Sequence, residues 1–245
     1  WPITHAEDAY GFAKVGQTIV NAPDAKIIRL YVDDEPLLIS IADLTDYERS
    51  IDFREGVLRR QMIWHTPGGK RLRITSERMV SFTERHLALM TFDIELLDHA
   101  APVSIASLVL NRQDGEDEYH VPFQSMGKQF DPRQANTFDR RVLEPRHHRL
   151  FASHDRVELG YQCAQSGMTI AVAAEHHFET ANDFTAERHV DEDLGKVTYH
   201  VDAQPKVPIR LTKFVSYHTS RGVPVPELID RGRGHPVRED RGLGV

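Results

Sequence analysis

Hydrophobic residues recur at every second position along most of this chain, and this period of two constrains the fold more than any other feature. In the clearest run, residues 88–96, apolar side chains fill the even positions: Ala88, Met90, Phe92, Ile94 and Leu96. Such alternation is typical of a β-strand with one buried face. The pattern recurs at residues 28–32, 58–64, 197–201 and 209–217. We therefore predict an all-β chain.

Two segments, residues 103–110 and 168–174, are apolar at odd and even positions alike. This is expected of central strands that are covered on both faces. Turn residues separate the apolar runs: Pro67-Gly68-Gly69, Ser166-Gly167 and Leu194-Gly195. Because such turns join neighbouring antiparallel strands, the sequence predicts a large two-sheet antiparallel β-sandwich.

Three segments depart from the strand pattern. Pro226 suits the first position of a short helix. Residues 111–141 have a weak, mixed pattern, which predicts a long functional or interface-forming excursion or, alternatively, two short strands. The glycine- and arginine-rich residues 232–245 predict a frayed end. We expect a sandwich domain over residues 1–222 and the start of a linker with a disordered tail over residues 223–245.

Composition excludes several classes of protein. With 40% hydrophobic and 27% charged residues, the 245-residue chain can bury a core and fold. The formal net charge of -7 and the lack of a basic stripe argue against nucleic-acid binding. The acidic run at Asp114, Glu116, Asp117 and Glu118 predicts a solvated loop, with a cation site as the alternative.

Features tied to cellular location are few. The single cysteine, Cys163, excludes an intrachain disulfide and favours the cytoplasm. Its place in the alternating row of Val157, Leu159 and Tyr161 predicts a buried, inert thiol. The longest uncharged apolar runs are far shorter than the roughly 20 residues of a membrane span. Trp1 follows no Met and no leader pattern, so we expect the chain to begin inside a longer protein.

A nine-residue motif, residues 52–60, lies ahead of Trp64 and carries the pattern Asp-x-Arg-x-Gly-x-Leu-x-Arg. Other short motifs accompany it in order: Tyr10-Gly11-Phe12, Gly16-Gln17, Val32-Asp33-Asp34-Glu35-Pro36-Leu37, Arg78 with Val80-Ser81, and Arg85-His86-Leu87-Ala88. Together they resemble the amino-terminal domain of glycoside hydrolase family 65, the maltose, trehalose and kojibiose phosphorylases and their hydrolase relatives. The resemblance covers about residues 1–230.

The resemblance implies a galactose-mutarotase-like supersandwich that precedes a helical linker and an (α/α)6 catalytic barrel. It further implies inverting attack on an α-linked glucose disaccharide by phosphate or water, with a glutamic acid protonating the leaving oxygen. In the family the acid and the phosphate pocket belong to the barrel, which is missing here. The implied partners are that barrel, the disaccharide reached through it, and a second copy in a homodimer. Inorganic phosphate is the co-substrate if the parent is a phosphorylase, and no cofactor is implied.

No catalytic, cofactor-binding or metal-binding residue is carried over from the family, so we expect this chain alone to be inactive. The family-motif residues predict a structural role: Asp52, Arg54, Glu55, Gly56, Leu58, Arg59 and Trp64. The charged members can form an Arg–carboxylate network at a strand-turn junction. Trp64 closes an apolar row, which favours a core anchor over a sugar-stacking platform.

Two other functions stay open from the sequence. A stand-alone mutarotase-like enzyme needs a neutral histidine and a carboxylate near one bound sugar, and His86, His176 and Glu175 are the candidates. A carbohydrate-binding module needs exposed aromatics, for which 8% aromatic residues is a thin supply. The pairs His147-His148 and His176-His177 are poor metal sites because neighbours on a strand point to opposite faces.

Overall fold

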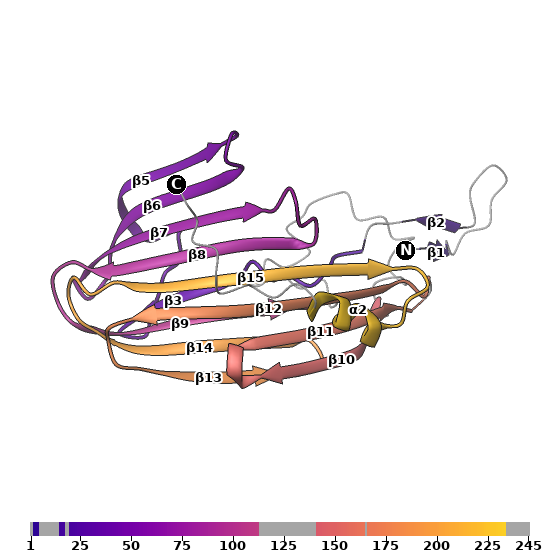
Figure 1. The fold of residues 1–245 in the computed structure, drawn as a ribbon. Coiled ribbons are helices and arrows are strands. Elements are labelled where there is room, and N and C mark those ends of the chain that lie inside the picture. The colour runs from indigo at the N-terminus through magenta and orange to yellow at the C-terminus, as the bar shows by residue number, and fades with distance from the viewer. Residues whose placement is uncertain (1, 5–14, 18–19, 113–140, 165, 234–245) are drawn as a thin grey trace.

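The structure is a computed structural model that describes residues 2–4, 15–17, 20–112, 141–164 and 166–233. A small two-stranded sheet pairs β1 (Pro2–Thr4) with β2 (Val15–Gln17). The remaining strands form two large antiparallel sheets that pack as a sandwich (Figure 1). The predicted fold class is therefore confirmed.

The larger sheet has eight strands in the order β10-β11-β12-β15-β8-β7-β6-β5. In chain order they are β5 (Asp43–Asp52), β6 (Val57–His65), β7 (Arg71–Val80), β8 (Leu87–Leu96), β10 (Leu143–Phe151), β11 (Arg156–Cys163), β12 (Thr169–Thr180) and β15 (Ile209–Ser220). A 3-10 turn, Ala152–His154, joins β10 to β11.

The smaller sheet has five strands in the order β13-β14-β9-β3-β4. They are β3 (Ile28–Val32), β4 (Glu35–Pro36), β9 (Ala101–Leu110), β13 (Phe184–Val190) and β14 (Leu194–Ala203). The core lies between the sheets, and its largest fully buried hydrophobic side chains include Trp64, Tyr161 and Tyr199. Cys163 is buried with a free thiol, as predicted.

The outer half of the larger sheet extends beyond this core. Strand β5 lies at the sheet edge and is exposed along most of its length. It projects with β6 away from the rest of the sandwich (Figure 1). We call the parts of β5–β8 toward the turns at residues 53–56 and 81–86 the hairpin extension.

The predicted turn at Leu194-Gly195 is wrong. Both residues belong to β14, and Gly195 pairs with Val109 and Val190. A Cβ atom at Gly195 would lie 3.0 Å from Val157, so this glycine permits close approach of the two sheets instead of a turn. The turn lies just before it, where the Asp191 carboxylate accepts the backbone N–H groups of residues 193 and 194 at 2.9 and 2.8 Å.

The predicted helix is present as α2 (Val225–Arg233), with Pro226 as its second residue. Its apolar residues Val225, Leu228 and Ile229 pack on Ala171 of β12, on the outer face of the larger sheet. This helix explains why β12 is apolar on both faces. Because Gly232 lies within α2, the prediction of a frayed stretch beginning at that residue is wrong. Residues 234–245 are outside the described residues.

Gly160 of β11 allows α2 to pack this closely. A Cβ atom there would lie 2.2 Å from a methyl group of Val225. We expect Gly160→Val to displace α2 and lower the free energy of unfolding by about 1–3 kcal/mol, despite the preference of valine for strands. Urea denaturation would measure the loss. Gly222→Ala is the matched control, since nothing lies within 4 Å of its Cβ position. Equal stability of the two variants would contradict this packing.

The two ends of the segment predicted as a long excursion, residues 111–141, are both hydrogen-bonded to Asp193. The Asn111 amide donates to Asp193 at 2.9 Å, and the Arg141 guanidinium donates to the same carboxylate at 2.8 Å. Residues 113–140, including the acidic run, lie outside the described residues. Within the described chain, no helix is long and apolar enough to cross a membrane.

Candidate functional site

The family motif forms the turn between β5 and β6. The Asp52 carboxylate accepts the backbone N–H groups of Arg54 and Glu55 at 2.8 and 3.0 Å. These bonds hold the pKa of Asp52 below its usual value, with Arg59 adding to the effect. Gly56 has φ of 71°, and its N–H donates to the Asp52 carbonyl at 2.8 Å. Glycine adopts the left-handed backbone conformation that this turn requires without steric strain.

Arg59 joins this turn to the next strand. Its guanidinium donates to Glu55 at 2.6 Å and to Glu77 of β7 at 2.8 Å. Both carboxylates raise the pKa of Arg59 above its ordinary value. Among the described residues the side chain of Arg54 makes no bond in this network, to which the residue contributes its backbone N–H. Since the arginine is 43% exposed, each ion pair contributes about 0–1 kcal/mol, and the network fixes geometry more than stability.

The apolar motif residues occupy the other face of β6. Trp64 is only 2% exposed and belongs to the core, whereas Leu58 is half-buried. The seven motif residues thus lie in one turn and strand but do not converge on a common point. Their arrangement suits a structural element rather than a reaction centre.

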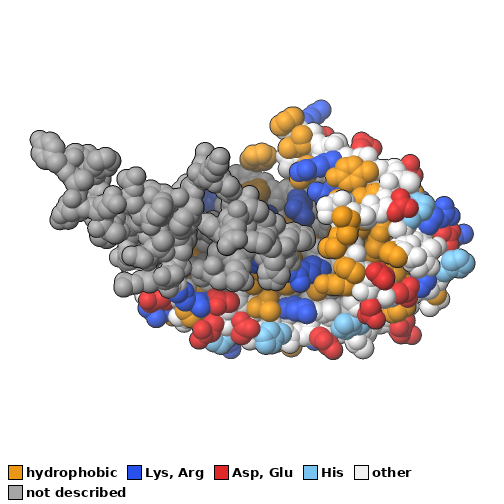
Figure 2. All heavy atoms as spheres, turned by 180° about the vertical axis from the view of Figure 1, so that it is seen from behind, with side chains coloured by type: hydrophobic (Ala, Val, Ile, Leu, Met, Phe, Trp, Pro, Cys, Tyr) orange, Lys and Arg blue, Asp and Glu red, His pale blue; other side chains and the backbone are white. Residues whose placement is uncertain are grey.

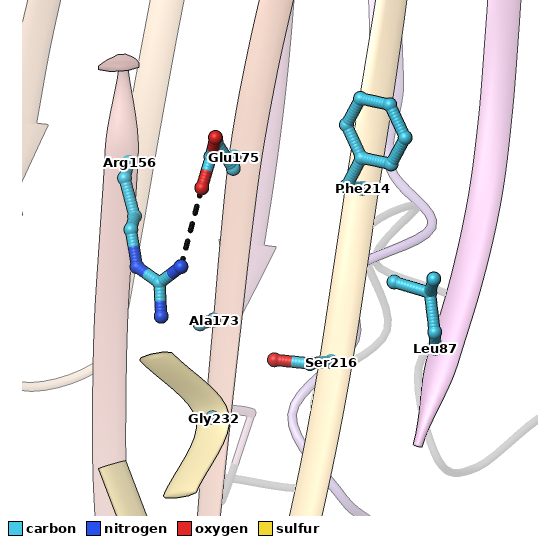
Figure 3. Close-up of a pocket in the computed structure, with 7 residues that line it drawn as sticks. All are labelled: Leu87, Arg156, Ala173, Glu175, Phe214, Ser216 and Gly232. Atoms are coloured by element: carbon cyan, nitrogen blue, oxygen red, sulfur yellow. Dashed lines mark hydrogen bonds and ion pairs between the residues drawn. The ribbon is translucent and has the colours of Figure 1, made fainter. Parts of the chain in front are cut away.

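A small pocket lies on the outer face of the larger sheet, beside the C-terminal end of α2. Its lining combines charged and apolar side chains: Leu87, Arg156, Ala173, Glu175, Phe214, Ser216 and Gly232 (Figure 3). Arg156 donates to Glu175 at 3.2 Å and to the fully buried Glu158 at 2.9 Å, and His147 lies 3.3 Å from Glu158. The cavity of about 20 Å³ holds one water molecule and no sugar ring.

A larger hollow of about 310 Å³ lies at one end of the sandwich. Its described lining is mostly apolar: Val20, Ala22, Leu143, Cys163, Ser166, Met168, Thr169, Ile170 and Thr219. The hydroxyl of Thr169 donates to the Val223 carbonyl at 2.7 Å. Apart from the buried Cys163, this lining contains no group that could act as an acid or base near neutral pH.

Polar groups are also buried between the sheets, around His176. Its Nε2 lies 2.8 Å from the Ser107 hydroxyl, and its Nδ1 lies 2.5 Å from the Asp155 carbonyl. Burial, reinforced by Lys213, lowers the pKa of His176 to about 4. The Asp155 carboxylate accepts from Tyr199 at 2.7 Å and from Arg188. Because each of these groups has a partner and none lines either of the two pockets described above, this cluster suits a role in the fold.

Lys213 is completely buried beside that cluster. Its ammonium donates to the Leu108 carbonyl at 2.8 Å, and burial lowers its pKa to about 7. Arg78 and Lys26 add to this shift, and Asp24 opposes it. In the unfolded chain the pKa is near 10.4. Between these values the unfolded state binds more protons than the folded state, so stability should rise with pH.

We expect the free energy of unfolding to increase between about pH 7.5 and 9.5, by at most about 1.4 kcal/mol per pH unit. Lys213→Met should remove that slope, because methionine occupies similar space without a titrating group. Urea denaturation across this pH range would measure it. Lys206→Met, at an exposed position, should retain the wild-type slope. A persisting slope in Lys213→Met would contradict the depressed pKa.

The residues considered for mutarotase chemistry are not brought together. His176 points between the sheets, whereas its neighbour Glu175 lies in the pocket on the outer face. His86 is held by the Tyr217 carbonyl at 2.7 Å and stacks on His218 with ring centroids 4.1 Å apart. The described residues contain no group of three or more potential metal ligands.

Exposed aromatics are more numerous than composition suggested. Phe53 and Phe82 are 86% and 87% exposed at the hairpin turns, and Tyr47 of β5 is 45% exposed. Phe184 is 44% exposed and lies on β13 of the other sheet, where its ring packs edge-on against Phe178 with ring centroids 4.9 Å apart. Three of these rings belong to the hairpin extension of the larger sheet and one belongs to the smaller sheet, so the four rings do not lie on a common sheet face.

The sequence did not predict the positions of four charged residues, a buried glutamate and three arginines that share one face. Glu158 alternates with Val157 and Leu159 and therefore points to the opposite face of β11, where the sequence carries no signal of its burial. Arg49, Arg60 and Arg78 lie on one face of the hairpin extension. Because neighbouring residues on a strand point to opposite faces, the adjacent arginines at positions 59 and 60 had to lie on different faces of the sheet.

The family model described as "Glycosyl hydrolase family 65, N-terminal domain" matches residues 1–240. An uncharacterized glycosyl hydrolase of Mycobacterium tuberculosis is 29% identical over 237 residues, which are 95% of this chain and 28% of the relative. An alpha,alpha-trehalose phosphorylase of Thermoanaerobacter brockii is 29% identical over 231 residues, which are 93% of this chain and 28% of the relative.

A solved structure described as "Putative kojibiose phosphorylase from human microbiome" has the same fold. Its TM-score is 0.75 at 12% identity, with 96% of this chain and 28% of that chain covered. The present chain thus spans about a quarter of the length of the relatives it matches.

Proposed function

We infer that this chain, which belongs to the N-terminal domain family of glycosyl hydrolase family 65, is a noncatalytic domain of a longer enzyme that cleaves α-linked glucose disaccharides. The family match over residues 1–240 carries this proposal. The favoured reaction is phosphorolysis, because relatives that share most of this chain are described as trehalose and nigerose phosphorylases. Inorganic phosphate would then be the co-substrate.

The described residues support a noncatalytic role. An inverting glycosidase needs a general acid and an activated nucleophile on opposite sides of a bound sugar. Neither described pocket offers this arrangement: one holds about a water molecule, and the other is lined almost entirely by apolar and hydroxyl groups. The chemistry is therefore assigned to the remainder of the parent protein, which we expect to contain an (α/α)6 barrel.

The domain would support that barrel and help to assemble a homodimer. A rigid sandwich with a projecting hairpin extension is suited to holding another domain in place. We place the parent in the cytoplasm, since the single cysteine is a buried free thiol and the fold uses no disulfide.

The test compares this chain with the full-length parent encoded by the same reading frame. Each protein is incubated with maltose, trehalose, kojibiose and nigerose, with and without phosphate, and free glucose and glucose phosphate are measured. We expect turnover by the parent only. Glucose phosphate formed only with phosphate present would identify phosphorolysis, whereas free glucose alone would identify hydrolysis.

Turnover by the chain alone would overturn the noncatalytic assignment. Glu175→Gln and His86→Ala would then show whether the mutarotase candidates carry the activity. A parent that cleaves none of these disaccharides would overturn the substrate class.

A further inference from the structure

The two faces of the hairpin extension differ in charge balance. On the outer face Arg59 of the extension is paired with Glu77 at 2.8 Å. Further along the same face of the sheet, Arg73 is paired with Glu95 at 3.2 Å and Arg210 with Asp93 at 3.4 Å. The inner face carries Arg49, Arg60 and Arg78, and none of them forms an ion pair with a described residue. Among the described residues, these three cations therefore share one surface without an ion-pair partner, in a chain of net charge -7.

Strand register places these arginines side by side. Arg49 and Arg60 are direct partners across β5 and β6. Arg60 opposes Ser76 on β7, so Arg78 is its diagonal neighbour on the same face. Burial and the charges of Arg60 and Arg49 lower the pKa of Arg78, while Asp24 acts in the opposite direction. Asp24 itself is bonded to Lys26 at 2.7 Å.

The guanidinium of Arg60 also has an unmet hydrogen bond. Its Nε is buried and has no acceptor among the described residues. A buried donor without an acceptor destabilises the protein, and the crowding of like charges does so to a smaller degree. Such a cost is removed when a partner supplies carboxylates to the arginine forks.

Apolar side chains accompany the arginines. Ile51 and Val80 share their face and are 55% and 64% exposed. Phe82 lies over Gly56 at the tip, where a Cβ atom would be 2.8 Å from its ring. In the rear view, Lys and Arg side chains lie among hydrophobic ones on this side of the molecule (Figure 2). Arginine and aromatic residues are enriched in protein interfaces, and exposed apolar patches mark them.

We propose that this arginine face, defined by Arg49, Ile51, Leu58, Arg60, Arg78 and Val80, docks an acidic surface in the remainder of the parent protein. Carboxylates of that surface accept hydrogen bonds from Arg60 and Arg78, and its apolar residues cover Ile51 and Val80. The spread of cations over three strands, with aliphatic residues among them, suits a protein surface better than a single small anion. The inference rests on the proposed function, since only a longer parent supplies the partner.

Photo-cross-linking in the full-length parent tests the proposal without using activity. A benzophenone amino acid replaces Arg60, or the exposed Arg49 as a second position should the first variant not fold. The control position is Arg73, on the outer face of β7. After irradiation, mass spectrometry maps the linked peptides. We expect cross-links from position 60 or 49 to Asp- or Glu-containing peptides beyond residue 245. The same cross-links should be absent when the benzophenone is at position 73.

Links confined to residues 1–245, or to a second copy of this domain, would overturn the proposal. A small oxyanion is the other possible occupant. If phosphate raises the melting temperature of the present chain above that in chloride of equal ionic strength, and Arg60→Ala but not Arg73→Ala removes the rise, the site binds an anion and the docking proposal fails. Cross-links in a parent that lacks phosphorolysis would overturn the proposed function alone.

Discussion

Replacing Trp64 with alanine should lower the free energy of unfolding by about 3–5 kcal/mol. Its side chain is 2% exposed and packs between the sheets on β6, where it is paired with Leu72 of β7 and Leu44 of β5. Removing the indole loses its transfer energy and leaves a cavity that two rigid sheets cannot close. Urea denaturation monitored by circular dichroism measures the change.

The matched control is Ile41→Ala, at a position that is 79% exposed, which should change stability by less than about 0.5 kcal/mol. Trp64→Phe should lie between the two variants because it keeps an aromatic ring in the core. A loss below about 1 kcal/mol for Trp64→Ala would show that the family motif does not anchor the sandwich.

Strand positions could be predicted from the sequence because burial in a sandwich leaves a direct period of two. The run at residues 88–96 is β8 (Leu87–Leu96), and the run at residues 209–217 lies within β15 (Ile209–Ser220). Gly195 was misread because glycine serves both turns and close sheet contacts, and only the tertiary structure shows Val157 beside it. Gly232 was misread because tertiary contacts of α2 outweigh the poor helix propensity of glycine.

The charged residues were harder to predict because their environment depends on strand register. Alternation places Arg59 and Arg60 on opposite faces, but it does not say that Arg59 meets Glu77 while Arg60 meets Arg49. Likewise, the apolar period does not reveal that α2 covers the outer face near Glu158. Partner identity across strands is set by the whole sheet, which no local pattern contains.

The buried carboxylate of Glu158 gives the second large effect. It is completely inaccessible, and its oxygens lie 2.9 Å from Arg156 Nε and 3.3 Å from His147 Nε2. Glu158→Gln keeps the shape but removes the negative charge, so a mostly buried arginine retains only Glu175, at 3.2 Å. Breaking a buried pair in this way costs about 3–5 kcal/mol, and we expect a loss of about 3 kcal/mol in urea denaturation.

A double variant separates the energy of the pair from the cost of an uncompensated charge. Arg156→Met with Glu158→Leu replaces both ions by apolar groups, and such exchanges are often neutral or stabilising. We therefore expect the double variant to be more stable than Glu158→Gln, a non-additivity that independent sites do not show. Glu179→Gln is the surface control, because Glu179 is 55% exposed beside His177 and should lose no more than about 1 kcal/mol. If the loss in the double variant equalled the sum of the losses in Arg156→Met and Glu158→Leu, the two residues would be energetically independent, and an uncompensated buried charge would not be the source of the loss.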